Sequence, residues 1–239
     1  MIFNVKIMLT LGFLMTLTNA EKLRLKRADV LESKKIGFET VKHLQGNVQF
    51  EKGDIKLNCQ KSVYKERKDI AFLFNQVKIF KDDLILECDS ITFYSKKNKL
   101  ESNGNPIIYD LDYKLVADSL IYFTELDSGI ALGNVELIQN NQKIKADRIE
   151  YVKNSGSEAI SYIAIGNVEI IDSLRTATCG LANYNDITEK TILDRRPIII
   201  DEQRTIAGEQ IVLQYDKKSL SRILIPNNAK ISSKIKEYN

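Results

Sequence analysis

The sequence predicts an exported, all-β protein in which copies of a repeat of about 29 residues fold around a narrow apolar interior. Three observations support this prediction. One motif recurs in register along most of the chain, and apolar and polar residues alternate with a period of two inside each copy. No stretch after the first 20 residues shows the capping residues and the 3.6-residue periodicity of a helix.

Three columns of residues define the repeat. A Gly-Asn pair usually precedes the first column, whose members are separated by steps of 29, 29, 29, 33 and 29 residues. The columns are a Val or Pro position (Val48, Val77, Pro106, Val135, Val168, Pro197), a small-residue position (Cys59, Cys88, Ala117, Ala146, Cys179, Gly208) and an aromatic position (Tyr64, Phe93, Tyr122, Tyr151, Tyr184), with Leu213 in the sixth copy. Independent columns rarely keep one register by chance, so we interpret the pattern as a structural repeat.

The phase of the alternation slips once within a copy. Ile144 and Ala146 are followed by Ile149 and Tyr151, a gap of three residues that would turn later side chains outward unless the strand bends. We therefore predict a corner at an acidic column, where a short carboxylate can bond its own backbone. This column contains Asp89, Asp118 and Asp147. The Gly-Asn pair, which favours left-handed conformations, is expected to mark the other turn.

The N-terminal residues are typical of a secretory signal. Lys6 supplies a positive charge, an uncharged and mostly apolar run follows, and Ala20 suits cleavage before Glu21. A buried N-terminal strand or helix is the alternative. We predict four segments: a signal peptide cleaved after Ala20 (1–20), a basic N-terminal arm (21–40), the β-repeat domain (41–225) and a C-terminal tail (226–239).

The sequence offers no set of residues for catalysis. His43 is the single histidine, so histidine-based metal clusters and Ser-His or Cys-His relays lack parts. The acidic column could in principle bind calcium or act as acid and base, but its recurrence in several copies favours the corner. The net charge of +3 is too small to indicate nucleic acid. We predict a protein that is not an enzyme, with no catalytic residues, no metal and no cofactor.

The three cysteines share the small-residue column, which indicates a packing role. Their odd number in an exported protein argues against a complete disulfide framework. If two strand rungs separate Cys59 from Cys88, their Cα atoms lie about 10 Å apart, beyond the ~7 Å limit for a disulfide. If each repeat is a single rung, this pair could oxidise.

The recurring Gly-Asn-Val, small-residue-Asp and Ile-x-Tyr elements resemble the OstA-like (organic solvent tolerance) family, which includes LptA and the N-terminal domain of LptD. The resemblance covers His43 to Tyr215. The chain departs from the pattern at the pairs Asn75-Gln76 and Arg195-Arg196, and at Gly180 and Glu209 in the acidic column. Because of the later departures, the sequence does not determine how far a groove extends toward the C-terminal end.

The resemblance implies a twisted β-jellyroll or β-taco with an open apolar groove that binds lipid A chains. It implies a non-enzymatic, periplasmic lipopolysaccharide-binding and transport protein for outer-membrane assembly, with inner- and outer-membrane transport components as partners. The predicted groove residues are the apolar columns Phe50, Leu57, Ile79, Leu86, Ile108, Leu115, Leu137 and Ile144. These columns could equally pack into a closed core.

Two alternatives concern assembly and function class. A stack of rungs leaves unpaired strand edges at both ends, expected near Val41 to Phe50 and near Ile206 to Ile225, which favours head-to-tail self-assembly. The alternative is that the basic arm before Leu31 or the tail after Pro226 folds over an edge and keeps the chain monomeric. The competing class is an exported parallel β-helix that acts as a polysaccharide-active enzyme or adhesin. Antiparallel pairing of the strands would exclude that class.

Overall fold

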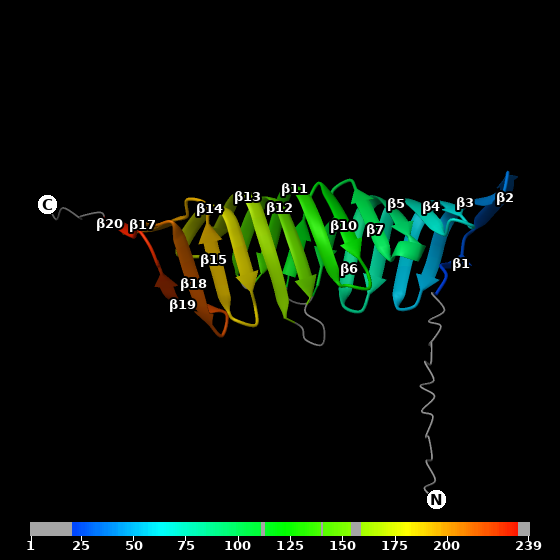
Figure 1. Cartoon of the computed structure of the whole chain (residues 1–239). Coiled ribbons are helices and arrows are strands. Elements are labelled where there is room, and N and C mark those ends of the chain that lie inside the picture. The colour runs from blue at the N-terminus through cyan, green and yellow to red at the C-terminus, as the bar shows by residue number, and fades with distance from the viewer. Residues whose placement is uncertain (1–20, 111–112, 140, 154–158, 234–239) are drawn as a thin grey trace, which may run out of the picture.

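The protein is one long antiparallel sheet folded lengthwise into two layers (Figure 1). The structure, a computed structural model, describes residues 21–110, 113–139, 141–153 and 159–233. Sequence order and spatial order agree, so the N-terminal strands lie at one end of the stack and the C-terminal strands at the other (Figure 1). Within the described residues, no helix is long and apolar enough to cross a membrane.

Each rung of the stack is a V that passes through both layers. Some rungs are single bent strands: β3 (Glu39–Lys52), β4 (Ile55–Lys65), β5 (Ile70–Lys81), β6 (Leu84–Tyr94), β11 (Ser128–Gln139), β12 (Gln142–Lys153), β13 (Ile160–Ile171) and β14 (Arg175–Asn185). Others are pairs of shorter strands: β1 (Arg24–Arg27) with β2 (Val30–Ile36), β7 (Lys99–Asn103) with β8 (Ile107–Tyr109), β9 (Tyr113–Val116) with β10 (Ser119–Phe123), β15 (Lys190–Asp194) with β16 (Ile198–Asp201), β17 (Arg204–Ala207) with β18 (Gln210–Asp216), and β19 (Ser219–Leu224) with β20 (Lys230–Ser233). A single 3₁₀ turn, η1 (Ser95–Lys97), joins β6 to β7.

The two layers are distinguished by their interior side chains. Layer I carries the aromatic column, and layer II carries the predicted groove residues. One apolar cluster fills the space between the layers. The rings of Phe50 and Tyr64 meet edge to face across it, with their centroids 5.5 Å apart. The pairing is antiparallel throughout the described residues. The predicted all-β jellyroll class is therefore confirmed, and a parallel β-helix is excluded.

The layers join along one corner, which both predicted turn signals build together. The backbone N–H of Asp118 donates to the carbonyl of Gly133, and the Asn134 side chain donates to the Asp118 carboxylate over 2.9 Å. A Cβ atom added at Gly133 would collide with that carboxylate, and its φ of +75° also favours glycine. The prediction that Gly-Asn marks a different turn is therefore wrong. The opposite side of each rung is made by hairpins, such as the one between Lys52 and Ile55.

The side-chain bond recurs at two other corners, whereas the backbone bond from Asp89 to Gly104, over 3.4 Å, has no accompanying side-chain bond among the described residues. Asn167 donates to Asp147 over 3.0 Å, and Asn47 donates to Asp29 over 2.8 Å. Asp29 therefore extends the acidic column into a rung that precedes the first repeat. The interaction stabilises the left-handed backbone that the bulge in each bent strand requires.

The stack is longer at both ends than the sequence predicts. The segment predicted as a basic arm contains β1 and β2, which form the first rung against β3. At the other end, β20 lies in the predicted tail and pairs with β17. Backbone pairing brings these segments into the stack although their side chains are mostly exposed, so apolar periodicity does not reveal them. The predicted signal peptide, 1–20, lies outside the described residues.

Two rungs separate Cys59 from Cys88. Val48 pairs with Cys59 and Val77 pairs with Cys88, while β5 lies between β4 and β6. All three cysteines are free, as expected when the paired positions are too far apart to bridge. Burial raises the pKa of each thiol to about 11, so the thiols stay protonated near neutral pH.

Candidate functional site

The eight predicted groove residues form one uninterrupted row along layer II. Each pairs in register with the next, from Phe50 and Leu57 on adjacent rungs to Leu137 and Ile144. Beyond Ile144 the row continues through Ile170, Ala177 and Ile199. The row is therefore longer than predicted and crosses the repeats in which the corner motif fades.

A second row faces it from layer I, nearer the hairpin side. Aromatic rings alternate there with small or aliphatic side chains on neighbouring strands, as in the series Tyr64, Ala71, Phe93, Leu100, Tyr122, Gly129 and Tyr151. The alternation lets bulky rings fit between rungs without steric conflict. At Gly129 the fit is so close that an added Cβ would strike the Tyr151 ring.

The interior between these rows is closely packed in this structure. None of the eight predicted residues is more than 5% exposed. The space between the layers near Ile170, Leu213 and Tyr215 amounts to about 20 Å³, too little for an acyl chain. An apolar ligand can therefore occupy this interior only if the two layers move apart.

Side chains close the hairpin side, and we call this line of contacts the polar seam. Lys52, on layer II, donates to the carbonyl of Ser95 over 2.5 Å and to the Asn98 amide oxygen on layer I. Lys81 makes the equivalent bridge, donating to the Thr124 carbonyl over 2.7 Å and to the Asp127 carboxylate. The seam thus holds the layers together through side chains.

Further contacts complete the polar seam. Tyr122 donates its hydroxyl to Asp127 over 2.7 Å, so the carboxylate accepts from both layers. Towards the C-terminal end, the Gln142 amide reaches the Tyr215 hydroxyl over 3.4 Å. At the N-terminal end, the Tyr64 hydroxyl donates to the Leu23 carbonyl over a similar distance and to Asp69 over 2.7 Å.

Burial strengthens the central bridge of the seam. The Lys81 side chain is only 11% exposed, so solvent screens its pairing with Asp127 weakly. Burial alone would raise the pKa of Asp127, but hydrogen bonds from Lys81 and Tyr122 outweigh it and hold that pKa below its usual value. The stabilisation by this carboxylate is present above its ordinary pKa and is lost as the pH falls through its lowered value. The bridge is therefore intact at neutral pH.

One buried hydroxyl lies just inside the seam without a partner. The Tyr151 hydroxyl has no hydrogen-bond partner among the described residues, and its ring stacks on Tyr122 with the centroids 6.4 Å apart. A small cavity of about 30 Å³, bordered by Lys81 and Asp127, adjoins it. Such a volume suits one water molecule, which would supply the missing hydrogen bond.

The sequence contains a signal for the seam that the repeat analysis did not use. Lys52 and Lys81 occupy the same position of successive copies, and an acidic residue follows Tyr64 and Tyr122 by five residues in each case. Lysine and aspartate at hairpin tips usually indicate solvated turns. Only the folding of the sheet into two layers brings these groups to face one another.

Comparison with known proteins finds a family model that matches part of the chain. Residues 114–219 match the family described as LptA/(LptD N-terminal domain) LPS transport protein. No curated protein matches the sequence. Among solved structures, the chain is similar to LptH of Pseudomonas aeruginosa, described as the LptA homologous periplasmic component of a lipopolysaccharide transport device. The identity is 12%, the match covers 64% of this chain and 95% of LptH, and the TM-score is 0.28.

Proposed function

We propose that this chain binds lipopolysaccharide and carries it during outer-membrane assembly, because residues 114–219 match the family described as LptA/(LptD N-terminal domain) LPS transport protein. The row of apolar side chains that runs unbroken from Phe50 to Ile144 and beyond is the observation that carries the proposal. The acyl chains would lie along this row, between the two layers. The protein would act as a shield, with no catalytic step.

The energetics of transfer explain why an unbroken row suits a carrier. Each methylene group kept from water contributes about 0.8 kcal/mol, so a twelve-carbon chain contributes roughly 10 kcal/mol. A lipid with several such chains crosses an aqueous gap at a useful rate only when these chains remain covered. Similar apolar environments at successive rungs let the lipid advance without one deep site that would trap it.

The polar seam gives the lipid a lateral route. Side-chain bridges at Lys52 and Lys81 can break and re-form without disturbing the backbone pairing within either layer. The corner hydrogen bonds, on the other side, keep the layers joined while the seam opens. During loading, the two layers would therefore separate along the polar seam while they stay joined at the corner.

A binding measurement tests the proposed function directly. We expect lipopolysaccharide to displace a fluorescent acyl probe from the purified protein, whereas deacylated lipopolysaccharide leaves the probe in place, because the interior accepts only the acyl chains. Displacement by both forms, or by neither, would contradict the proposal.

Each strand at the two ends of the described stack has one edge without a neighbouring strand, and such edges suit contact with transport components of the inner and outer membranes. At the N-terminal end these strands are β1 and β2, and at the C-terminal end they are β19 and β20. End-to-end contact between copies of this chain would make the apolar row continuous from one protomer to the next. Such a carrier belongs in the periplasm, which agrees with the predicted signal peptide.

Charge at the two ends predicts how self-assembly responds to salt. β1 carries Arg24, Lys26 and Arg27, while β19 and β20 carry Arg222 and Lys230, so both ends are basic. We expect sedimentation velocity to show stronger association at about 500 mM salt than at about 20 mM, because salt screens the repulsion. Association that weakens as salt rises would contradict contact between these two ends.

A further inference from the structure

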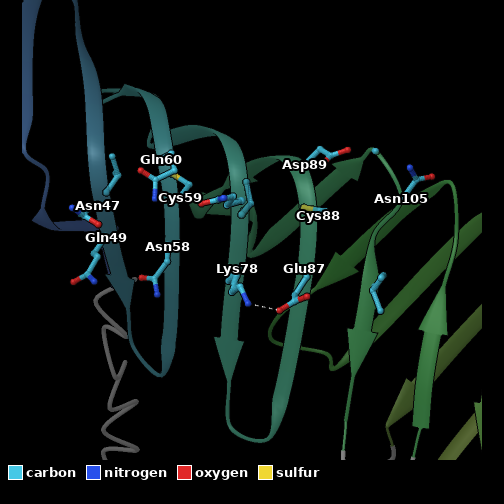
Figure 2. A pocket seen from close by; sticks show the side chains of 15 residues that line it. Asn47, Gln49, Asn58, Cys59, Gln60, Lys78, Glu87, Cys88, Asp89 and Asn105 are labelled. Carbon is cyan, nitrogen blue, oxygen red and sulfur yellow. Dashed lines mark hydrogen bonds and ion pairs between the residues drawn. The ribbon is translucent and has the colours of Figure 1, made fainter.

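A polar cleft of about 740 Å³ lies on the outside of layer II, along the corner and away from the polar seam (Figure 2). Its lining comes from β3, β4, β5, β6 and the segment that leads into β8. Phe50 and Leu57 of the apolar row are fully buried and do not line the cleft, whereas Gln49 and Asn58, which alternate with them along β3 and β4, do. The cleft is therefore separate from the proposed lipid path.

Side-chain amides supply most of the polar groups in the lining of this cleft, beside apolar residues that include Val48, Val77 and Ile107. Figure 2 shows Asn47, Gln49, Asn58, Gln60 and Asn105 around it. Gln49 and Asn58 face each other in register on adjacent strands, and the row continues through Lys78 and Glu87. A primary amide offers two donors and one acceptor in a fixed plane. A cleft that presents several amides therefore matches a ligand that carries several hydroxyl and amide groups.

The cleft includes a corner at which the sequence lacks the aspartate and the Gly-Asn pair of other copies. Other copies place an aspartate against an asparagine, as in the hydrogen bond from Asn134 to Asp118. Here Gln60 occupies the acidic position and Asn75-Gln76 replaces Gly-Asn. For the side chains of Gln60 and Gln76, the described part of the chain records no hydrogen bond. Gln76 also keeps a left-handed backbone with φ of +55°, which costs of order 1–3 kcal/mol in a residue of this type.

The charges in the cleft nearly cancel. The Lys78 ammonium donates to Glu87 over 2.6 Å, as the dashed line in Figure 2 shows, and these groups offset each other. Asp89 is left at the rim. An anionic ligand would find no excess positive charge here, and no aromatic ring is among the lining residues. Recognition must come from hydrogen bonds to neutral polar groups.

We propose that this cleft binds an extended oligosaccharide whose hydroxyl and N-acetyl groups bond to the amides of Gln49, Asn58, Gln60 and Gln76. The saccharide could come from a cell-wall glycan or from the sugar portion of a glycolipid, because both present this chemistry. Without a stacking ring the affinity is modest, with a dissociation constant on the order of 1 mM. Saccharide binding at this cleft does not depend on lipid binding between the two layers.

NMR titration of the ¹⁵N-labelled protein tests the site. Chitotetraose and deacylated lipopolysaccharide are added separately, and the side-chain NH₂ signals of the four amides are followed. We expect these signals to shift with at least one probe, and the probe that binds identifies the source of the saccharide. An absence of shifts with both probes at about ten times the expected dissociation constant would overturn the proposal.

Matched variants locate the binding. Asn58→Ala with Gln60→Ala should weaken binding about tenfold, because two hydrogen bonds are lost. Gln60→Asp with Asn75→Gly and Gln76→Asn should also weaken it while keeping or raising the melting temperature, because these three changes restore the corner residues of the other copies. Gln214→Ala, on layer I, should have no effect. Shifts that persist unchanged in both cleft variants would contradict this site, whatever the outcome of the acyl-probe measurement.

Discussion

Ile144→Asp is expected to abolish displacement of the acyl probe by lipopolysaccharide and to lower the free energy of unfolding by more than about 4 kcal/mol. Ile144 is 1% exposed and lies in register between Leu137 and Ile170. A carboxylate there has no cation within the apolar row to pair with. Urea unfolding measures the stability, and probe displacement under folding conditions measures the binding.

The neighbouring residue provides the matched control. Lys145 points outward, its side chain is 46% exposed, and it pairs with Glu169 over 3.0 Å. Lys145→Asp loses a surface ion pair and brings carboxylates together, which costs about 1 kcal/mol or less. We expect lipid binding to remain. Equal effects of the two substitutions would show that the row from Phe50 to Ile144 is not the interior surface that matters.

Locking the polar seam is expected to remove lipid binding while the fold remains intact. Cysteines placed at Lys81 and Asp127 face each other across the seam, and a short bis-maleimide would join the layers there. Because the packed interior has no room for an acyl chain, the linked protein should bind neither the acyl probe nor lipopolysaccharide. The same variant without the linker should bind at least as well as the parent.

A second cysteine pair distinguishes the effect of locking the seam from the effect of attaching a linker. The backbone N–H of Lys153 donates to the carbonyl of Asp127 within layer I, over 2.9 Å. A linker between cysteines at these two positions joins neighbouring hairpins and does not cross the seam. Binding should survive this link. Loss of binding in both linked variants, or in neither, would contradict lateral entry through the seam.

These variants need a background without native thiols. Replacing Cys59, Cys88 and Cys179 with alanine should leave the melting temperature within a few degrees of the parent, because alanine already occupies this column at Ala117 and Ala146. Circular dichroism of the triple variant checks the fold. A collapse of the β signal would show that the column needs the volume of sulfur.

The repeat made much of this architecture predictable. The alternation within each copy identified the row of eight interior residues, and the slip of phase at Asp118 and Asp147 located the corner. Both signals depend on side chains that are buried or locally bonded, so the same residue types recur at these positions of the sequence. The family resemblance rests on the same columns.

Other features depend on contacts that local patterns do not record. β2 is exposed along its whole length and is held by backbone pairing to β3, so nothing in its side chains distinguishes it from a solvated arm. Gly-Asn and aspartate meet at one corner because successive rungs reverse direction, which a single copy does not reveal. The seam partners Lys81 and Asp127 are 46 residues apart.

Photo-crosslinking of lipopolysaccharide inside the protein tests the central claim most directly. A photoreactive amino acid is placed at Leu115, in the interior row, and in a separate variant at Lys145, on the outer face. The proposed carrier predicts a covalent lipopolysaccharide adduct at Leu115 and none at Lys145 when each variant, folded as judged by circular dichroism, is irradiated with the lipid. An adduct at Lys145 alone, or at neither position, would contradict a lipid path between the two layers.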